Sequence, residues 1–246
     1  MNLSIPRLRV FAGPNGSGKS TIKSRLIPEW LGIYVNADEI ESELSLDGRL
    51  DLSQFEIVTT PGEVECFLST SPLVARSRTA SHWRAVGSGL EIEGSSADSY
   101  FASAVADFVR RKLLLARRTF TFETVMSSRD KVEFLQQARV SGFRTYLYYV
   151  ATEDPEINVS RVRNRVRSGG HPVPEDKIRS RYVRSLDNLL DAITNADRAY
   201  VFDNSGREAV WVAEITSGTD LEIRAESMPH WFETWVWNRF DDTEPA

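Results

Sequence analysis

The chain has 246 residues, with 30 Lys or Arg against 35 Asp or Glu, so its formal net charge is −5. Hydrophobic residues make up 41% of the chain and charged residues 26%, a balance that excludes collagen-like, coiled-coil and wholly disordered proteins. The length is enough to bury a core without disulfide or metal staples, and the acidic balance argues against DNA as a partner.

The sequence also limits the compartment in which we expect the protein. No apolar run approaches the ~18 residues that a membrane span needs, and the opening stretch MNLSIPRLRVFAG lacks the charged-then-apolar order of a secretory signal. The one cysteine, Cys66, has no partner for an internal disulfide. We therefore expect a cytoplasmic protein with no membrane partner.

Apolar runs that fit strands alternate with segments that fit helices. Strands are expected over residues 7–13, 33–37, 119–123, 144–151 and 198–203, with a sixth over 209–216. Helices are expected over 19–30, 97–117, 129–140, 155–168 and 175–196. Helical crossovers between strands predict an α/β fold: a single domain over 1–246 with a mainly parallel sheet of five or six strands and helices on both faces.

The first strand runs into a glycine-rich loop of the form G-x-x-x-x-G-K-[ST]. Its residues are Gly13, Pro14, Asn15, Gly16, Ser17, Gly18, Lys19 and Ser20, with Thr21 following. A phosphate must approach the loop's N–H groups closely, which a Cβ would block, and the helix N-terminus that follows favours anions. The pattern predicts an ATP site in which Lys19 contacts the β- and γ-phosphates and Ser20 ligates Mg²⁺.

Asp38 follows the second strand, in the sequence Val35-Asn36-Ala37-Asp38-Glu39. Ligands of open parallel sheets bind beyond the carboxyl ends of the strands, so we expect Asp38 on the same edge as the glycine loop. A carboxylate there can take the proton of an attacking hydroxyl, as a kinase base does. The alternative is that Asp38 caps a helix.

Residues 45–96 interrupt the alternation with a Ser/Thr-rich stretch. Short alternating segments at 55–60, 65–70 and 90–94 predict small strands rather than helices. Long stretches of this kind are uncommon in compact domains unless they have a function. The insert is either a small subdomain that covers the substrate or a decoration without a catalytic role.

Glu123 ends the third strand and lies on the same predicted edge. It can bind substrate hydroxyls or hold Mg²⁺ through water, and the alternative is an ion pair at the rim of the sheet. Thr124 follows it directly. Arg129 is either a clamp for a substrate anion or a residue of the first helical turn.

Positive charge is concentrated between residues 161 and 184, where eight basic residues face two acidic ones, a local charge of +6. Residues 155–184 form a helix, a glycine-rich turn that His171 is expected to shape, and a second helix, which is the pattern of a mobile lid. Arg161 and Arg165 share a helix face and can stabilise charge on a transferring phosphoryl group. The alternative is a solvated basic face.

Residues 219–246 are expected to form a C-terminal helix and tail. Phe232, Val236 and Phe240 recur at helical spacing among three tryptophans within 229–240. Such a stripe predicts a helix docked on the body of the protein, and the alternative is a protein interface.

Four of these motifs together resemble the zeta-toxin-like P-loop kinases, and match best a branch described as predicted AAA/ABC-type ATPases. They are Gly13–Ser20, Asn36-x-Asp38, Phe120-x-Phe122-Glu123-Thr124, and Arg161-Val162-x-x-Arg165-Val166-x-x-Gly169-Gly170-His171-x-Val173-Pro174. The resemblance covers 7–42 and 97–206, and its most specific part includes Phe202-Asp203-Asn204-Ser205. Residues 45–96 have no counterpart, and Thr124-Val125-Met126 stands where zeta toxins have Thr-Leu-Arg.

The resemblance implies a five-stranded parallel sheet, ATP and Mg²⁺, and phosphorylation of a small-molecule hydroxyl, which in zeta toxins belongs to UDP-N-acetylglucosamine. It implies Lys19 as the phosphate lysine, Asp38 as the base, and Arg161 and Arg165 in the lid. The substrate pocket would hold Asn36, Glu123, Thr124 and Arg129, and an antitoxin protein is an implied partner. The alternative function is an ATP-binding or ATP-hydrolysing switch that engages a macromolecule, although the chain has no hhhhDE strand typical of ATPase motors.

Overall fold

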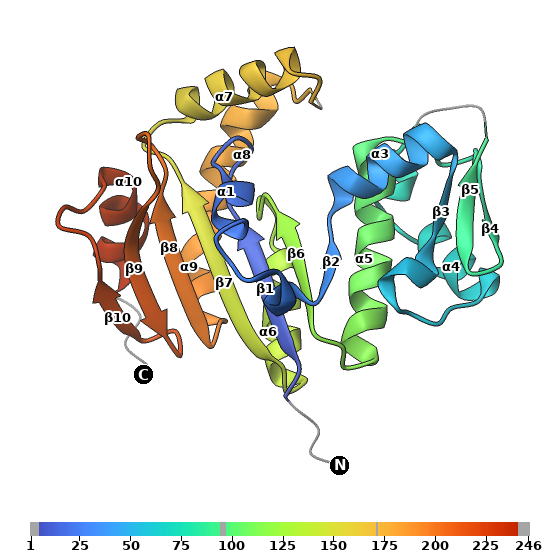
Figure 1. Ribbon diagram of the computed structural model, residues 1–246, viewed down its shortest axis with the longest axis horizontal. Helices are drawn as coiled ribbons and strands as arrows, with labels where there is room; N and C mark the ends of the chain where they lie inside the picture. Colours follow the sequence, from blue (N-terminus) through green and yellow to red (C-terminus); the bar gives the residue numbers. More distant parts are fainter. Residues whose placement is uncertain (1–4, 94–96, 171, 241–246) are drawn as a thin grey trace. The chain divides into compact units, whose positions relative to one another are not determined.

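Figure 1 shows the computed structural model, which describes residues 5–93, 97–170 and 172–240. The chain forms two compact units: unit 1 comprises the segment that ends at Leu31 together with the chain from Glu123 onward, and unit 2 comprises Gly32–Phe122. Gly94, His171 and the end of the predicted tail, 241–246, lie outside the described ranges. Within those ranges, no helix combines the length and the apolar character that crossing a membrane requires.

Unit 1 is built on a twisted sheet whose strands lie in the order β10-β9-β8-β7-β1 (Figure 1). The strands are β1 (Arg7–Ala12), β7 (Arg144–Ala151), β8 (Arg198–Asp203), β9 (Val210–Thr216) and β10 (Asp220–Ile223). β1, β7 and β8 are parallel, whereas β9 and β10 are antiparallel additions. The predicted α/β fold with a mainly parallel sheet is confirmed, and β10 is a strand that the sequence pattern did not indicate.

Helices lie on both faces of this sheet. The helices of unit 1 are α1 (Lys19–Lys23), α2 (Pro28–Leu31), α6 (Asp130–Val140), α7 (Pro155–Arg167), α8 (Glu175–Asp187), α9 (Leu189–Thr194), α10 (His230–Phe232), the π-helix η3 (Glu233–Trp237) and α11 (Asn238–Phe240). On one face, Ile22 of α1 packs on Phe11 and Val150. On that same face the rings of Phe11, Tyr148 and Tyr200 stack across β1, β7 and β8, with centroids 4.8 and 5.0 Å apart.

Two predicted helices are interrupted. The helix expected over 19–30 ends at Lys23 and a new one begins at Pro28, because proline cannot donate an N–H and disfavours helical backbone at the residue before it. The helix expected over 175–196 divides at Asn188, whose side chain donates to the carbonyls of Met126 and Arg184 at 3.0 Å.

Unit 2 contains a parallel pair of strands and a separate antiparallel sheet. β2 (Ile33–Val35) pairs with β6 (Phe120–Thr124), and the small sheet has the order β3-β5-β4. Its strands are β3 (Arg49–Asp51), β4 (Trp83–Val86) and β5 (Gly89–Ile92). The helices are α3 (Ala37–Asp47), η1 (Leu52–Phe55), α4 (Pro61–Ser69), η2 (Val74–Arg76) and α5 (Ser99–Leu115).

The expectation of strands in the insert is correct only in part. β5 covers most of 90–94, but 55–60 contains the end of η1 and irregular backbone, and 65–70 lies mostly in helix α4. Residues 61–69 form a helix because Thr60 and Glu63 make a capping box at its start, with Pro61 in the first helical position. Val64 and Leu68, four residues apart, then bury one face of that helix.

Asp98 begins the long helix α5 and also fastens the chain that precedes it. Its carboxylate accepts hydrogen bonds from the N–H groups of Tyr100 at 3.1 Å and Phe101 at 3.0 Å, and from the N–H of Arg78 at 2.7 Å. Burial opposes ionisation of Asp98, but these backbone donors outweigh it and lower its pKa below the ordinary 3.8.

We expect Asp98→Ala to lower the free energy of unfolding by about 1–2 kcal/mol at neutral pH, the usual cost of losing an N-cap. A depressed folded pKa stabilises the fold above the unfolded pKa, and this contribution is lost as the pH falls through the folded value. The deficit of Asp98→Ala should therefore shrink between pH 7 and about pH 2.5 in urea titrations. Asp98→Asn, a good cap at every pH, is the control, and an equal deficit at both pH values would contradict the assignment.

Candidate functional site

The glycine loop occupies the turn between β1 and α1, where the spacing predicts it. Gly13 and Gly18 have φ angles of +137° and +96°, a region that side-chain-bearing residues rarely adopt. A Cβ on Gly13 would lie 2.0 Å from the carbonyl oxygen of Val150, and one on Gly18 would lie 2.1 Å from Nδ2 of Asn204. Both positions therefore require glycine, because the φ angle disfavours other residues and because Val150 and Asn204 leave no room for a Cβ.

Lys19 reaches back over the loop that precedes it. Its Nζ donates to the carbonyl oxygens of Gly13 at 2.8 Å and Pro14 at 3.1 Å. The side chains of Ser20 and Thr21 face solvent at the start of α1. The loop thus presents an ammonium group and two hydroxyl-bearing residues at one end of the sheet in unit 1.

Two asparagines hold the loop from opposite ends: Asn158, which the sequence analysis did not single out, and Asn204, which it named in a motif without assigning it a role. Asn158 of α7 is fully buried and donates from Nδ2 to the carbonyl of Asn15 at 2.7 Å, while it accepts a hydrogen bond from the hydroxyl of Thr152. Asn204, which follows β8, donates from Nδ2 to the carbonyl of Ser17 at 2.7 Å. The sequence did offer one signal for Asn158: it lies on the same buried face of α7 as Val159 and Val162, where a polar side chain needs a hydrogen-bond partner.

The predicted lid is a helical hairpin, α7 and α8, whose helices pack through Val159, Val162 and Ile178. Part of its positive charge is paired internally, as the solvated-face alternative expects: Arg163 pairs with Glu175, and Arg179 bonds Glu156 at 2.6 Å. The hydrogen bond from Arg179 lowers the pKa of Glu156.

Arg161 is different from the paired arginines of the hairpin. Its Nη2 donates to the carbonyl of Gly206 at 3.3 Å, in the segment that follows Asn204. Its Nη1 is buried and lacks a hydrogen-bond partner among the described residues, as do Oγ of Ser17 and Oδ1 of Asn15 in the loop itself. Buried polar atoms of this kind usually have partners. Arg165 is exposed one turn further along α7.

The last residues of β6, and Arg129 after it, take structural partners within unit 1. Glu123, with its side chain 10% exposed, pairs with Lys23 at 3.2 Å, which is the rim ion pair given above as the alternative. Thr124 accepts a hydrogen bond from the N–H of Met126 at 3.0 Å. Arg129 precedes the first turn of α6 and pairs with Asp191 of α9.

Asp38 and Asn36 belong to unit 2. Asn36, not Asp38, caps helix α3: its Oδ1 accepts from the N–H of Asp38 at 3.0 Å, and its Nδ2 donates to the hydroxyl of Tyr34 at 3.2 Å. The carboxylate of Asp38 is exposed and is not used as the cap. The capping alternative for Asp38 is therefore wrong, and its side chain is available for other contacts.

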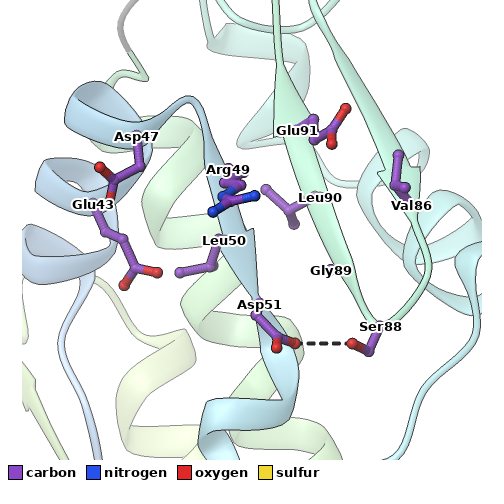
Figure 2. A pocket seen from close by; sticks show the side chains of 10 residues that line it. All are labelled: Glu43, Asp47, Arg49, Leu50, Asp51, Val86, Ser88, Gly89, Leu90 and Glu91. Atoms are coloured by element: carbon purple, nitrogen blue, oxygen red, sulfur yellow. Dashed lines mark hydrogen bonds between the residues drawn. The ribbon is translucent and has the colours of Figure 1, made fainter.

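Two hollows of the described residues lie away from these predicted site residues. One, of about 480 Å³, lies in unit 2 between α3 and the small sheet (Figure 2). Its lining includes Asp51 and Ser88, and the hydroxyl of Ser88 donates to Asp51 at 2.8 Å. Another, of about 400 Å³, lies beside Arg144 and Arg198 at the start of β7 and β8.

A parallel α/β sheet in which the first strand feeds a glycine loop with a lysine at the helix start defines a P-loop protein, and the fold is that of the P-loop kinases. The family model described as Zeta toxin matches residues 91–216, which is more than half of the chain. The chain therefore belongs to the zeta toxin family. The matched range includes α7, α8 and Asn204 and begins after the glycine loop and Asp38.

Other relatives are similar over shorter stretches or in fold alone. A protein of Haemophilus influenzae described as uncharacterized is 35% identical over 63 residues, which are 26% of this chain and 45% of that protein. A solved structure of AvrRxo1-ORF1:AvrRxo1-ORF2 with sulphate ions superposes with a TM-score of 0.61 at 15% identity, over 94% of this chain and 64% of that one. The AvrRxo1-ORF1:-ORF2 structure with ATP gives 0.58 at 15% identity, over 89% and 61%. The chain thus spans less than two thirds of these proteins.

We expect Asn158→Ala to lower the free energy of unfolding by about 1–3 kcal/mol, because the carbonyl of Asn15 loses its amide donor and the buried hydroxyl of Thr152 is left with its 3.3 Å bond to the carbonyl of Asp154. Hydrogen exchange should rise at the amides of 13–18, measured by mass spectrometry. The control is Ser160→Ala, an exposed change on the same helix. Unchanged exchange in the loop of Asn158→Ala would show that this amide does not hold it.

Proposed function

We propose that this protein is an ATP-dependent phosphotransferase that acts on a hydroxyl of a small molecule, for which a nucleotide sugar is the first candidate. The observation that carries the proposal is the glycine loop itself, with Lys19 folded over it and two asparagines bonded to its carbonyls. Membership of the zeta toxin family and the fold shared with the ATP-containing AvrRxo1 structure support it.

The loop has the features that the phosphates of ATP require. Because asparagine amides occupy the carbonyls of Asn15 and Ser17, the carbonyl oxygens are turned to the protein rather than toward an anion. The ammonium of Lys19 now bonds two carbonyls, and a phosphate can replace these acceptors with charge-assisted bonds. The unpartnered Nη1 of Arg161 is a further donor for an anion.

The same loop fits a magnesium cofactor through Ser20, whose side chain is exposed at the start of α1. Hard cations prefer oxygen ligands and are commonly bound by one or two protein oxygens together with phosphate. Mg²⁺ would supply charge neutralisation on the phosphates. Thr21 follows Ser20 in the sequence, and Glu123 is the carboxylate that we assign to a contact with Mg²⁺ through water.

We assign to Asp38 the role of the base and to Asn36, Glu123, Thr124 and Arg129 contacts in the acceptor pocket. The support for Asp38 is that its carboxylate is exposed and relieved of capping by Asn36. The others already have partners: Lys23 pairs with Glu123, the N–H of Met126 donates to Thr124, Asp191 pairs with Arg129, and Asn36 caps α3. An acceptor that binds there must replace or share these partners.

We assign Arg161 and Arg165 to stabilisation of the phosphoryl oxygens during transfer. Arg161 is supported by its contact with Gly206 in the segment that follows Asn204, which brings α7 and the phosphate loop into one network within unit 1. A protein partner comparable to an antitoxin is proposed from the family alone. A switch that hydrolyses ATP while bound to a macromolecule is the alternative, and the product of the reaction separates the two.

We expect Lys19→Ala to weaken the binding of ATP·Mg²⁺ by about ten- to a hundredfold, the value of one charge-assisted hydrogen bond. Isothermal titration calorimetry measures the affinity. Arg25→Ala, which removes an exposed positive charge just after α1, is the matched control and should bind normally. Equal affinity of Lys19→Ala and the parent protein would contradict the nucleotide site.

We expect Asp38→Asn to keep ATP affinity and to slow phosphoryl transfer by about 10²- to 10⁴-fold, the usual contribution of a general base. The assay offers ³³P-labelled ATP and a small-metabolite pool, and mass spectrometry identifies the phosphorylated product. Asp47→Asn, at the other end of α3, controls for the loss of charge. Release of inorganic phosphate alone, whatever metabolite is offered, would favour the switch.

A further inference from the structure

The C-terminal segment, residues 229–240, is docked on unit 1, as the apolar stripe predicts. Trp231, Phe232 and Val236 are buried, with exposed fractions of 3%, 0% and 0%. The ring of Trp231 lies 6.4 Å from that of Tyr149 in β7 and 5.8 Å from that of Phe232. Apolar packing accounts for the docking, but it does not account for the direction in which the indole N–H points.

The indole N–H of Trp231 donates to Oδ1 of Asp203, with Nε1 and Oδ1 2.8 Å apart. Trp has a single side-chain donor, so this bond fixes the rotation of the ring. The same carboxylate accepts from the hydroxyl of Ser205 at 2.7 Å and from its N–H at 3.2 Å. Asp203 and Ser205, the neighbours of Asn204, are thus bonded to each other through the Asp203 carboxylate, and the indole of Trp231 donates to that same carboxylate.

Asn204 lies between these two residues and its conformation is set on both sides. Its N–H donates to the carbonyl of Ala151 at 2.8 Å, and Ser205 accepts from the N–H of Glu153 at 2.7 Å. These bonds aim the amide of Asn204 at the carbonyl of Ser17. The approach is close enough that any Cβ on Gly18 would collide with the amide.

We propose that Trp231 is a positioning residue for the phosphate loop, acting through Asp203 and Asn204 on the carbonyl of Ser17. The inference rests on the proposed nucleotide site for its effect on ATP binding, although its effect on the loop does not need a nucleotide. The C-terminal segment is then part of the machinery that shapes the site, and a partner or modification that displaces it would loosen the loop.

Trp231→Phe tests the proposal, because it keeps an aromatic ring in the packing and removes the N–H. Trp237→Phe is the matched control: it lies in the same segment, is 43% exposed, and takes no part in the path. Without nucleotide, Trp231→Phe should raise hydrogen exchange at the amides of 13–18 above that of Trp237→Phe. Equal exchange in the two variants would overturn the proposal.

A double-mutant cycle with Asn204→Ala shows whether the effect passes through the asparagine. In the parent background, Trp231→Phe should weaken ATP·Mg²⁺ binding by about three- to tenfold, the value of one hydrogen bond. In the Asn204→Ala background the same change should have less than about a twofold effect. An equal loss in both backgrounds would assign Trp231 to general packing and refute the path.

Asp203→Asn provides a second route should Trp231→Phe unfold, because it weakens the acceptor of the same bond and leaves the indole packing intact. It should raise loop exchange in the same way, and no rise would count against the proposal. Failure of the proposed function has a separate signature. In that case the parent protein and Lys19→Ala would have the same affinity for ATP·Mg²⁺, while the exchange difference between Trp231→Phe and Trp237→Phe would remain.

Discussion

The conformation of the glycine loop depends on hydrogen bonds that two side chains outside the loop donate to its carbonyl oxygens. A short segment rich in glycine has little conformational preference of its own and loses much entropy when it becomes ordered. Here the amide of Asn158 holds the carbonyl of Asn15, and the amide of Asn204 holds that of Ser17. These two bonds turn the carbonyl oxygens toward the protein, which is what the proposed nucleotide site requires of the loop.

The need to hold the loop carbonyls also explains why polar side chains are buried next to the loop. Thr152 and Asn158 are fully buried; the hydroxyl of Thr152 donates to Asn158, and Asn158 donates to the loop carbonyl of Asn15. The hydroxyl of Tyr182 donates to the carbonyl of Thr152 at 2.6 Å, so helix α8 supports α7. Burial of an unpaired amide costs free energy, and a connected set of partners avoids that cost. The hairpin of α7 and α8 is thereby bonded to the segment that precedes α7 and to the glycine loop.

Much of the fold could be predicted from the sequence, because apolar runs indicate strands and glycines mark the turns at the ends of strands and helices. The strands of the parallel sheet are examples, and so is the loop from Gly13 to Ser20. The contacts of Asn158 and Asn204 could not be found in this way, because their partners lie 143 and 187 residues away in the sequence. The pairing of Glu123 with Lys23 is also set by tertiary packing. In the insert, α4 was missed although its start signal, Thr60-Pro61-Gly62-Glu63, is local.

The order in which these partners occur along the chain has a consequence for synthesis. β1 is synthesised before β7, with which it pairs in the sheet. In that parallel register Arg7 lies opposite Arg144, and the ring of Phe11 stacks on that of Tyr148. β1 can therefore join the sheet only after more than a hundred further residues have been made. The loop that follows it acquires its last fastening only when Asn204 and then Trp231 emerge. Contacts of such long range form slowly and late. A nascent chain that stalls before them carries the glycine motif without the bonds that hold its conformation.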